Sequence, residues 1–110
     1  MIAVITSEFN KEIVNGLLDG CKKSLKGHDL DIIKVPGAFE LPSTAKQCVD
    51  SSKYKAVITL GCVIRGETDH YDYICKAVSN GIMDVSIESN IPVLFGVLTC
   101  QNSEFAFERS

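Results

Sequence analysis

A short segment between Gly61 and Cys75 combines residue types that could bind an anion and transfer a proton. It reads GCVIRGETDHYDYIC, and it places an arginine, a threonine and a histidine soon after the apolar residues 57–60. An unperturbed histidine titrates at about pH 6.5, so His70 suits proton transfer near neutral pH. The glycines predict that a strand ends at Gly61 and that a helix begins near Asp69. An ordinary connection between strand and helix explains the same residues, so this segment alone leaves both interpretations open.

Three further segments with aromatic or polar residues fall at the carboxyl ends of the other predicted strands: residues 7–10 (SEFN), 35–42 (VPGAFELP) and 95–99 (FGVLT). In open parallel sheets, ligands bind outside the carboxyl ends of the strands, so the convergence of four segments is a stronger signal than any one motif. Phe9 and Phe95 could stack on a flat ring, although either residue taken alone is more typical of the core. Glu40 could bind a polar ligand, or it could be a carboxylate stabilised at a helix N-terminus.

The elements that must position these segments alternate between apolar strands and amphipathic helices. Strands are predicted at residues 2–6, 31–35, 56–60 and 93–98, with helices after the first, second and third and the start of a fourth helix near Glu104. The clearest helical stripe consists of Tyr71, Ile74, Cys75, Val78, Ile82 and Val85. This alternation predicts an α/β fold, a flavodoxin-like three-layer α/β/α sandwich with a four-stranded parallel sheet and helices on both faces.

The composition fits a single globular domain spanning residues 1–110. The net charge is -3, and the sequence has no basic run that would indicate a nucleic acid or membrane partner. The opening residues MIAVIT are too short for a transmembrane helix and lack the pattern of a signal peptide, so we expect a cytoplasmic protein. A parallel sheet is normally covered on both faces, so we expect the short fourth helix to continue in a longer natural chain or to be replaced by a neighbouring subunit.

The cysteines do not indicate a disulfide framework or a metal site. Their number is odd, and they lack C-x-x-C or Cys/His ligand spacing: Cys21, Cys48, Cys62, Cys75 and Cys100. Each lies within or beside an apolar pattern, where a reduced cysteine behaves as a small hydrophobic residue. We expect packing or a backbone contact for the one beside the candidate site, Cys62.

Taken together, the four segments resemble the motifs of the lumazine synthase family, which makes the direct precursor of riboflavin. SEFN, VPGAFELP, GCVIRGETDHYDY and PVLFGVLTCQNSEFAFER occur in the family's order and cover nearly the whole chain. The resemblance implies a transferase that condenses 5-amino-6-(D-ribitylamino)uracil with 3,4-dihydroxy-2-butanone 4-phosphate, without metal or organic cofactor. It also implies homo-oligomers, either pentamers or sixty-subunit shells, with active sites between adjacent subunits and riboflavin synthase as a further partner.

The resemblance also implies a role for each matching residue. The pyrimidine and its ribityl chain would be bound by Phe9, Asn10, Ala38, Phe39, Glu40, Cys62, Val63, Ile64 and Phe95. The butanone phosphate would be bound by Glu67, Thr68 and Arg109, with Arg109 reaching in from the neighbouring subunit. His70 would be the proton donor and acceptor. Judged without the resemblance, Arg109 is a surface arginine, and Glu67 is an awkward side chain for an anion site.

Three departures separate this sequence from the family pattern. The family continues past the position of Arg109 into a long helix, it has an N-terminal extension without counterpart here, and it often has glutamine where Phe105 stands. The alternative function is a non-catalytic flavin-binding or assembly protein of the same fold. A receiver-like phosphate-binding domain is a third interpretation, but the acidic cluster expected near a receiver's first strand is not in the sequence.

Overall fold

The computed structural model describes residues 1–64 and 71–100 and shows strands that alternate with helices along the chain. The elements are β1 (Ile2–Ser7), α1 (Lys11–Ser24), β2 (Leu30–Val35), the 3-10 turn η1 (Ala38–Glu40), α2 (Leu41–Asp50), β3 (Ala56–Ile64), α3 (Tyr71–Glu88) and β4 (Val93–Cys100). The predicted fourth helix near Glu104 lies outside the described residues.

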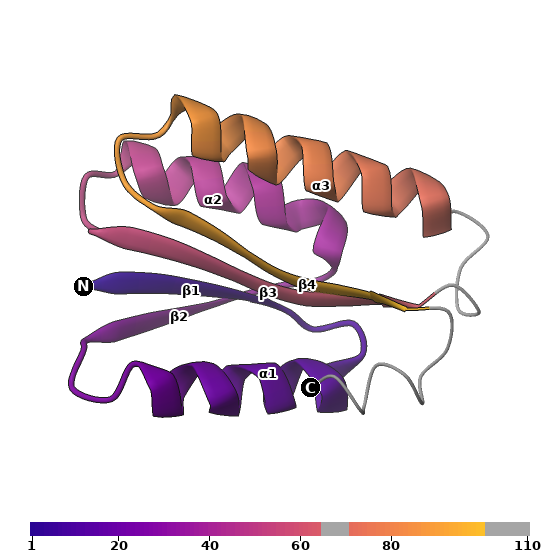
Figure 1. Ribbon diagram of the computed structural model, residues 1–110, viewed down its shortest axis with the longest axis horizontal. Helices are drawn as coiled ribbons and strands as arrows, with labels where there is room; N and C mark the ends of the chain where they lie inside the picture. Colours follow the sequence, from indigo (N-terminus) through magenta and orange to yellow (C-terminus); the bar gives the residue numbers. More distant parts are fainter. Residues whose placement is uncertain (65–70, 101–110) are drawn as a thin grey trace.

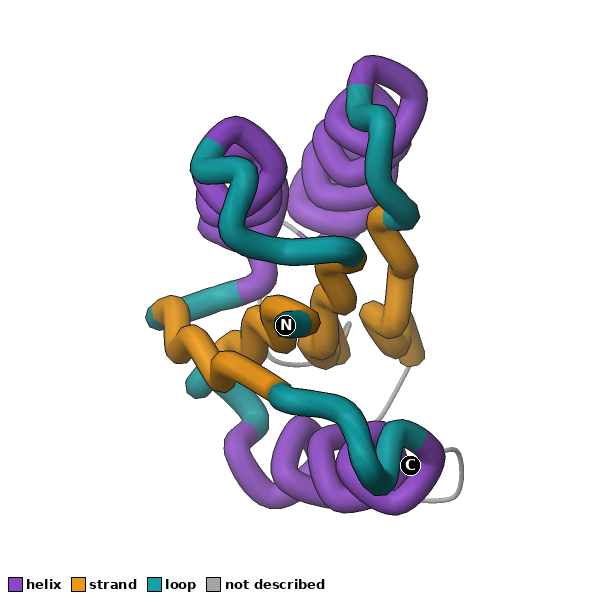
Figure 2. Tube along the Cα trace, turned by 90° about the vertical axis from the view of Figure 1, so that its left-hand side faces the viewer, coloured by secondary structure: helices purple, strands orange, loops and turns teal. Residues whose placement is uncertain are grey.

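The four strands form one parallel sheet in the order β2-β1-β3-β4. Figure 1 views the sheet from its β4 edge, with α2 and α3 on one side of the sheet and α1 on the other. Figure 2, turned by 90°, shows the same three layers. This arrangement confirms the predicted flavodoxin-like α/β/α sandwich with a four-stranded parallel sheet.

Each face of the sheet has its own core, because successive strand side chains point to opposite faces. Ala3, Ile5 and Val57 belong to the core cluster that includes residues of α2 and α3. Val4 and Ile58 belong to a separate cluster against which α1 packs. The alternating burial therefore places one helical layer on each face.

The predicted apolar stripe of α3 is confirmed. Val78, Ile82 and Val85 are buried in the cluster against the sheet, and Ile74 and Cys75 pack against it. A helix of 3.6 residues per turn brings these positions to one face, which covers the sheet beside α2.

The prediction that the third strand ends at Gly61 is wrong, because β3 continues through Gly61 to Ile64. The glycine serves a close approach instead of a bend. A Cβ atom at Gly61 would lie 3.0 Å from the Oγ atom of Ser7 and 3.1 Å from the Cδ1 atom of Leu41. Strand β4 also continues beyond the predicted end, to Cys100.

The turn after β2 is short. Pro36 and Gly37 lead into the 3-10 turn η1, which runs directly into α2. The turn after α1 uses Gly27, whose φ of 94° is in the left-handed region that favours glycine. Within the described residues, no helix is both long and apolar enough to cross a membrane.

Candidate active site

Three of the predicted site segments come together at the carboxyl ends of β1, β2 and β3. The backbone N–H of Glu8 donates to the carbonyl of Val35 at 2.8 Å, and that of Phe9 donates to the carbonyl of Pro36 at 3.2 Å. These bonds fix the turn after β1 against the turn after β2. The carboxyl ends of adjacent parallel strands therefore form one edge, as expected for a ligand site in this fold.

Gly61 is the point at which all three segments meet. A Cβ atom at this position would also lie 3.7 Å from the Cβ atom of Ala38, in addition to its close approach to Ser7 and Leu41. The missing side chain lets η1 and the end of β1 pack directly on β3. The backbone at this edge is therefore compact beneath the exposed aromatic rings.

Two aromatic rings at this edge remain accessible. The Phe9 side chain is 55% exposed, and the Phe39 side chain is 53% exposed. The Phe39 ring stacks on the ring of Tyr73 in the first turn of α3, with centroids 6.3 Å apart and an interplanar angle of 21°. Exposed rings held on a fixed backbone can pack against a flat heterocycle.

The Glu40 carboxylate stabilises its own turn. Its Oε2 atom accepts a hydrogen bond from the backbone N–H of Gly37 at 3.0 Å, and the hydroxyl of Ser43 donates to the Glu40 carbonyl at 3.2 Å. The structure thus shows the role at the start of a helix that the sequence allowed. The role of Glu40 in substrate binding stays a prediction.

Ala38, Cys62 and Val63 have buried side chains. Cys62 packs against Ile13 and Val14 of α1, and its carbonyl accepts a hydrogen bond from the Nδ2 atom of Asn10 at 3.2 Å. These contacts confirm the expected packing and backbone role of Cys62. Burial also raises the pKa of the Cys48 and Cys75 thiols, which fits their packing roles. The side chain of Cys100 is not among those that the structure describes.

Phe95 lies apart from the other predicted site residues. It is in the first half of β4 and pairs with Thr59, whereas the Asn10 side chain reaches β3 at Cys62. Three residues of strand separate these levels, or about 10 Å. The expectation that Phe95 lies at the carboxyl end of its strand is therefore wrong, because β4 continues to Cys100.

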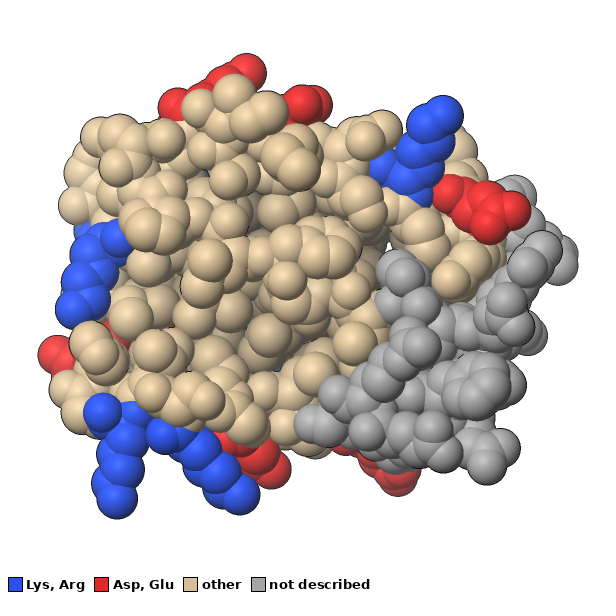
Figure 3. Space-filling view, in the orientation of Figure 1, with Lys and Arg blue, Asp and Glu red and all other residues tan. Residues whose placement is uncertain are grey.

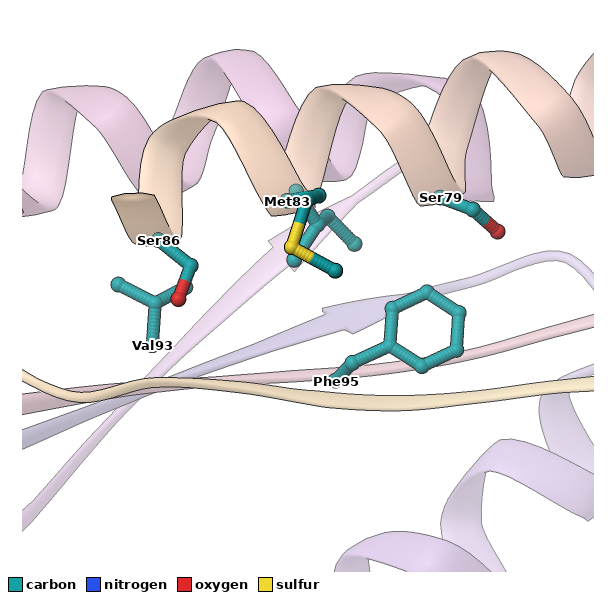
Figure 4. A pocket seen from close by; sticks show the side chains of 6 residues that line it. Ser79, Met83, Ser86, Val93 and Phe95 are labelled. Carbon is teal, nitrogen blue, oxygen red and sulfur yellow. The ribbon is translucent and has the colours of Figure 1, made fainter. Parts of the chain in front are cut away.

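Phe95 borders an apolar groove between α3 and β4, as Figure 4 shows. The groove has a volume of about 330 Å³ and is lined by Ser79, Ile82, Met83, Ser86, Val93 and Phe95. The Phe95 ring is 48% exposed, and Met83 and Ile87 of α3 are also exposed. The outer strand β4 and the neighbouring helix α3 therefore present apolar side chains that the described residues do not cover.

The remaining predicted site residues lie largely outside the described residues. Glu67, Thr68 and His70 fall between β3 and α3, and Arg109 falls after β4. Of Ile64, the structure describes the backbone at the end of β3. The predicted phosphate-binding and proton-transfer roles therefore stay predictions.

Sequence analysis missed three residues at or near these surfaces. Tyr73 stacks on Phe39, and Met83 borders the groove, yet both lie off the buried stripe of α3. Large apolar residues off that stripe were the signal that could have identified them. The third is Ser7, which opens the segment SEFN but was given no role of its own; its buried Oγ atom has no hydrogen-bond partner in the structure.

The described residues contain no group of three or more His, Cys, Asp or Glu side chains that could hold a metal ion. They contain two exposed aromatic rings, Phe9 and Phe39, at the carboxyl ends of the strands. Comparison with protein families agrees with this geometry, because the chain matches the family described as 6,7-dimethyl-8-ribityllumazine synthase over residues 1–110. The family implies a transferase-type enzyme that acts on small molecules. Because the match covers the whole sequence and the flavodoxin-like fold agrees with it, the chain belongs to the 6,7-dimethyl-8-ribityllumazine synthase family.

Proposed function

We propose that this protein condenses 5-amino-6-(D-ribitylamino)uracil with 3,4-dihydroxy-2-butanone 4-phosphate to form 6,7-dimethyl-8-ribityllumazine, the penultimate step of riboflavin biosynthesis. The observation that carries the proposal is the gathering of Phe9, the turn Ala38–Glu40 and the end of β3 at one edge, in a chain of this family. We further propose a cytoplasmic enzyme whose product passes to riboflavin synthase.

The proposed reaction begins when the amine of the pyrimidine attacks the ketone, which loses water to form an imine. Phosphate then leaves, and the ring closes with proton transfers and loss of further water. Phe9 and Phe39 would pack against the pyrimidine, and the ribityl chain would extend along the backbone between Ala38 and the end of β3. Holding both substrates in one orientation supplies much of the rate gain in such a condensation.

Phosphate binding and proton transfer would be carried out by residues that the structure does not describe. Glu67 and Thr68 would bind the phosphate through the segment before α3, together with Arg109 from a neighbouring copy. The planar guanidinium of Arg109 suits a phosphate group because it can donate two parallel hydrogen bonds. His70 would transfer the protons, since its ordinary pKa lies near neutral pH.

The site would form between copies of the chain. Phe95 is half-exposed on an edge strand, about 10 Å along the sheet from the level of Asn10 and Cys62. The surface in Figure 3 that includes this edge has Lys, Arg, Asp and Glu around its rim and uncharged residues across its centre. Among the exposed apolar residues are Met83, Ile87 and Phe95, and a patch of such residues is typical of an interaction site. We propose that Phe95 of one copy packs against the Phe9 ring of the next, in a pentamer or larger shell.

The decisive assay is incubation of the purified oligomer with both substrates, followed by the fluorescence of the lumazine product. Product formation at a rate proportional to enzyme concentration is expected. A folded oligomer that binds riboflavin but makes no product would instead be a non-catalytic flavin-binding protein of this fold.

Two variants separate the proposed chemical roles in the same assay. His70→Ala is expected to lower kcat by roughly 10²- to 10⁴-fold with pyrimidine binding retained, because it removes the proton-transfer group. Arg109→Ala is expected mainly to raise the KM for the butanone phosphate, because it removes a phosphate contact. Wild-type kinetics in both variants would contradict these assignments.

A further inference from the structure

Asn10 stands at the start of α1 in an unusual conformation. Its φ and ψ of 62° and 48° are left-handed, whereas the residue before a helix usually has an extended backbone. Asparagine is among the few residues other than glycine that adopt the left-handed region readily. The turn therefore depends on the residue type at this position.

The side chain of Asn10 does not cap the helix that it precedes. The backbone carbonyl of Asn10 accepts hydrogen bonds from the N–H groups of Ile13 and Val14, both at 3.1 Å. The side-chain amide is directed elsewhere, and its Nδ2 atom donates to the carbonyl of Cys62 at 3.2 Å. This bond joins residues 52 positions apart in the sequence.

The Asn10–Cys62 hydrogen bond connects two parts of the proposed site. On one side, Asn10 follows Phe9, whose backbone N–H is already bound to Pro36. On the other side, Cys62 lies in β3, two residues before that strand ends at Ile64. The bond therefore ties the residue that follows Phe9 to the strand that leads to the segment before α3.

We propose that Asn10 is a positioning residue that acts through this hydrogen bond and through its left-handed backbone, and does not bind the substrate with its amide nitrogen. This inference rests on the proposed function for its kinetic consequence, and it assigns Asn10 a different role from the one that the family resemblance implies. Because the bond orients Phe9 in the free enzyme, its loss weakens binding of the pyrimidine substrate and leaves the chemical steps unchanged.

Two substitutions separate the hydrogen bond from the other roles of Asn10. Asn10→Gly keeps the left-handed backbone without strain and removes the amide. Asn10→Asp keeps a residue that is equally favoured at a helix N-cap, but its carboxylate cannot donate to the Cys62 carbonyl. A matched control is Ser51→Ala, which removes another side-chain hydrogen bond to a backbone carbonyl, from Ser51 Oγ to Cys48 at 2.7 Å, at the far end of α2.

The experiment measures steady-state kinetics and amide hydrogen exchange for the wild-type oligomer and the three variants. Asn10→Gly and Asn10→Asp are each expected to raise the KM for the pyrimidine substrate by about tenfold, with kcat within a factor of about two. Both are also expected to speed exchange at residues 60–64, far from the substitution in sequence, by several-fold. Ser51→Ala is expected to change neither quantity.

Wild-type KM and exchange in Asn10→Asp would overturn the proposal, because they would show that the hydrogen bond from Asn10 to the Cys62 carbonyl affects neither pyrimidine binding nor the end of β3. A fall in kcat with unchanged KM would also overturn it. If the wild-type protein makes no lumazine, the proposed function fails. Hydrogen exchange at residues 60–64 still decides whether Asn10 fixes the end of β3.

Discussion

The sheet has an amino edge, where the parallel strands begin, and a carboxyl edge, where they end. Backbone hydrogen bonds hold the loops in the same way at both, but the side chains differ. At the amino edge, the N–H of Ile2 donates to the carbonyl of Asp29 at 2.9 Å. At the carboxyl edge, the N–H of Glu8 donates to the carbonyl of Val35 at 2.8 Å. In both places the bond ties a loop to the neighbouring strand.

The side chains at the amino edge bind one another. Tyr54 is buried, and its hydroxyl donates a hydrogen bond to the carboxylate of Asp31. At the carboxyl edge, Phe9 and Phe39 are more than half exposed, and the buried hydroxyl of Ser7 has no partner in the structure. A fixed backbone that presents exposed aromatic rings is the arrangement that a preorganised site requires. We infer that the amino edge serves stability and the carboxyl edge serves binding.

Breaking the Tyr54–Asp31 hydrogen bond tests the amino edge. Tyr54→Phe is expected to lower the free energy of unfolding by about 1–2 kcal/mol, because a hydrogen bond to a charged group is lost. Urea unfolding measures this change. The value of kcat/KM at neutral pH is expected to stay at the wild-type level, and a large fall in a folded variant would show that the amino edge also serves the reaction.

The pH dependence of stability reports on the same bond. Donation to the Asp31 carboxylate raises the pKa of Tyr54 from 10.0 to about 12. Because the pKa is higher in the folded state, this contribution is fully present below pH 10 and is lost as the pH rises from about 10 to about 12. The wild-type protein is therefore expected to lose more stability over this range than Tyr54→Phe. Equal losses in the two proteins would contradict the assignment.

Removing the unpaired hydroxyl tests the carboxyl edge. Ser7→Ala is expected to raise the free energy of unfolding by about 1 kcal/mol, because a buried polar group without a partner is costly. The matched control is Thr59→Val, which removes a buried hydroxyl that donates to the carbonyl of Leu94 at 2.9 Å. In that variant the free energy of unfolding is expected to fall by about 1 kcal/mol. If stability rises in both variants, or falls in both, the proposed difference between the unpaired Ser7 hydroxyl and the bonded Thr59 hydroxyl is contradicted.

The smallest effect is expected from the stacked rings of Phe39 and Tyr73. A double-mutant cycle with alanine at both positions is expected to give a coupling energy of about 0.5 kcal/mol, since both rings are largely exposed. Tyr73→Phe keeps the ring and is expected to retain wild-type stability. Strict additivity of the two alanine variants would mean that the contact does not support the Phe39 ring.

The parts of the fold that depend on local patterns could be predicted from the sequence. The spacing of Val78, Ile82 and Val85 fixes the buried face of α3, because helical periodicity is local. Gly61 was misinterpreted as the end of a strand, since glycine favours turns. The reason for glycine there is a close approach of Ser7 and Leu41, which no local pattern contains.

The same limit applies to the candidate site. The positions of Phe9 and Glu40 after predicted strands were enough to place them at one edge. The hydrogen bond from Asn10 to Cys62 joins distant residues, and the level of Phe95 depends on the register between β3 and β4. Both are set by tertiary packing, so sequence patterns could not predict them.

The most direct test of the account is complementation between two variants that each lack one ring of the proposed shared site. Phe9→Ala and Phe95→Ala are each expected to form oligomers with little lumazine synthase activity. When equal amounts are unfolded together and refolded as mixed oligomers, about a quarter of the interfaces should pair an intact Phe9 with an intact Phe95. The account predicts recovery of about a quarter of the wild-type activity on mixing. Mixed oligomers no more active than the separate variants would contradict a site shared between copies.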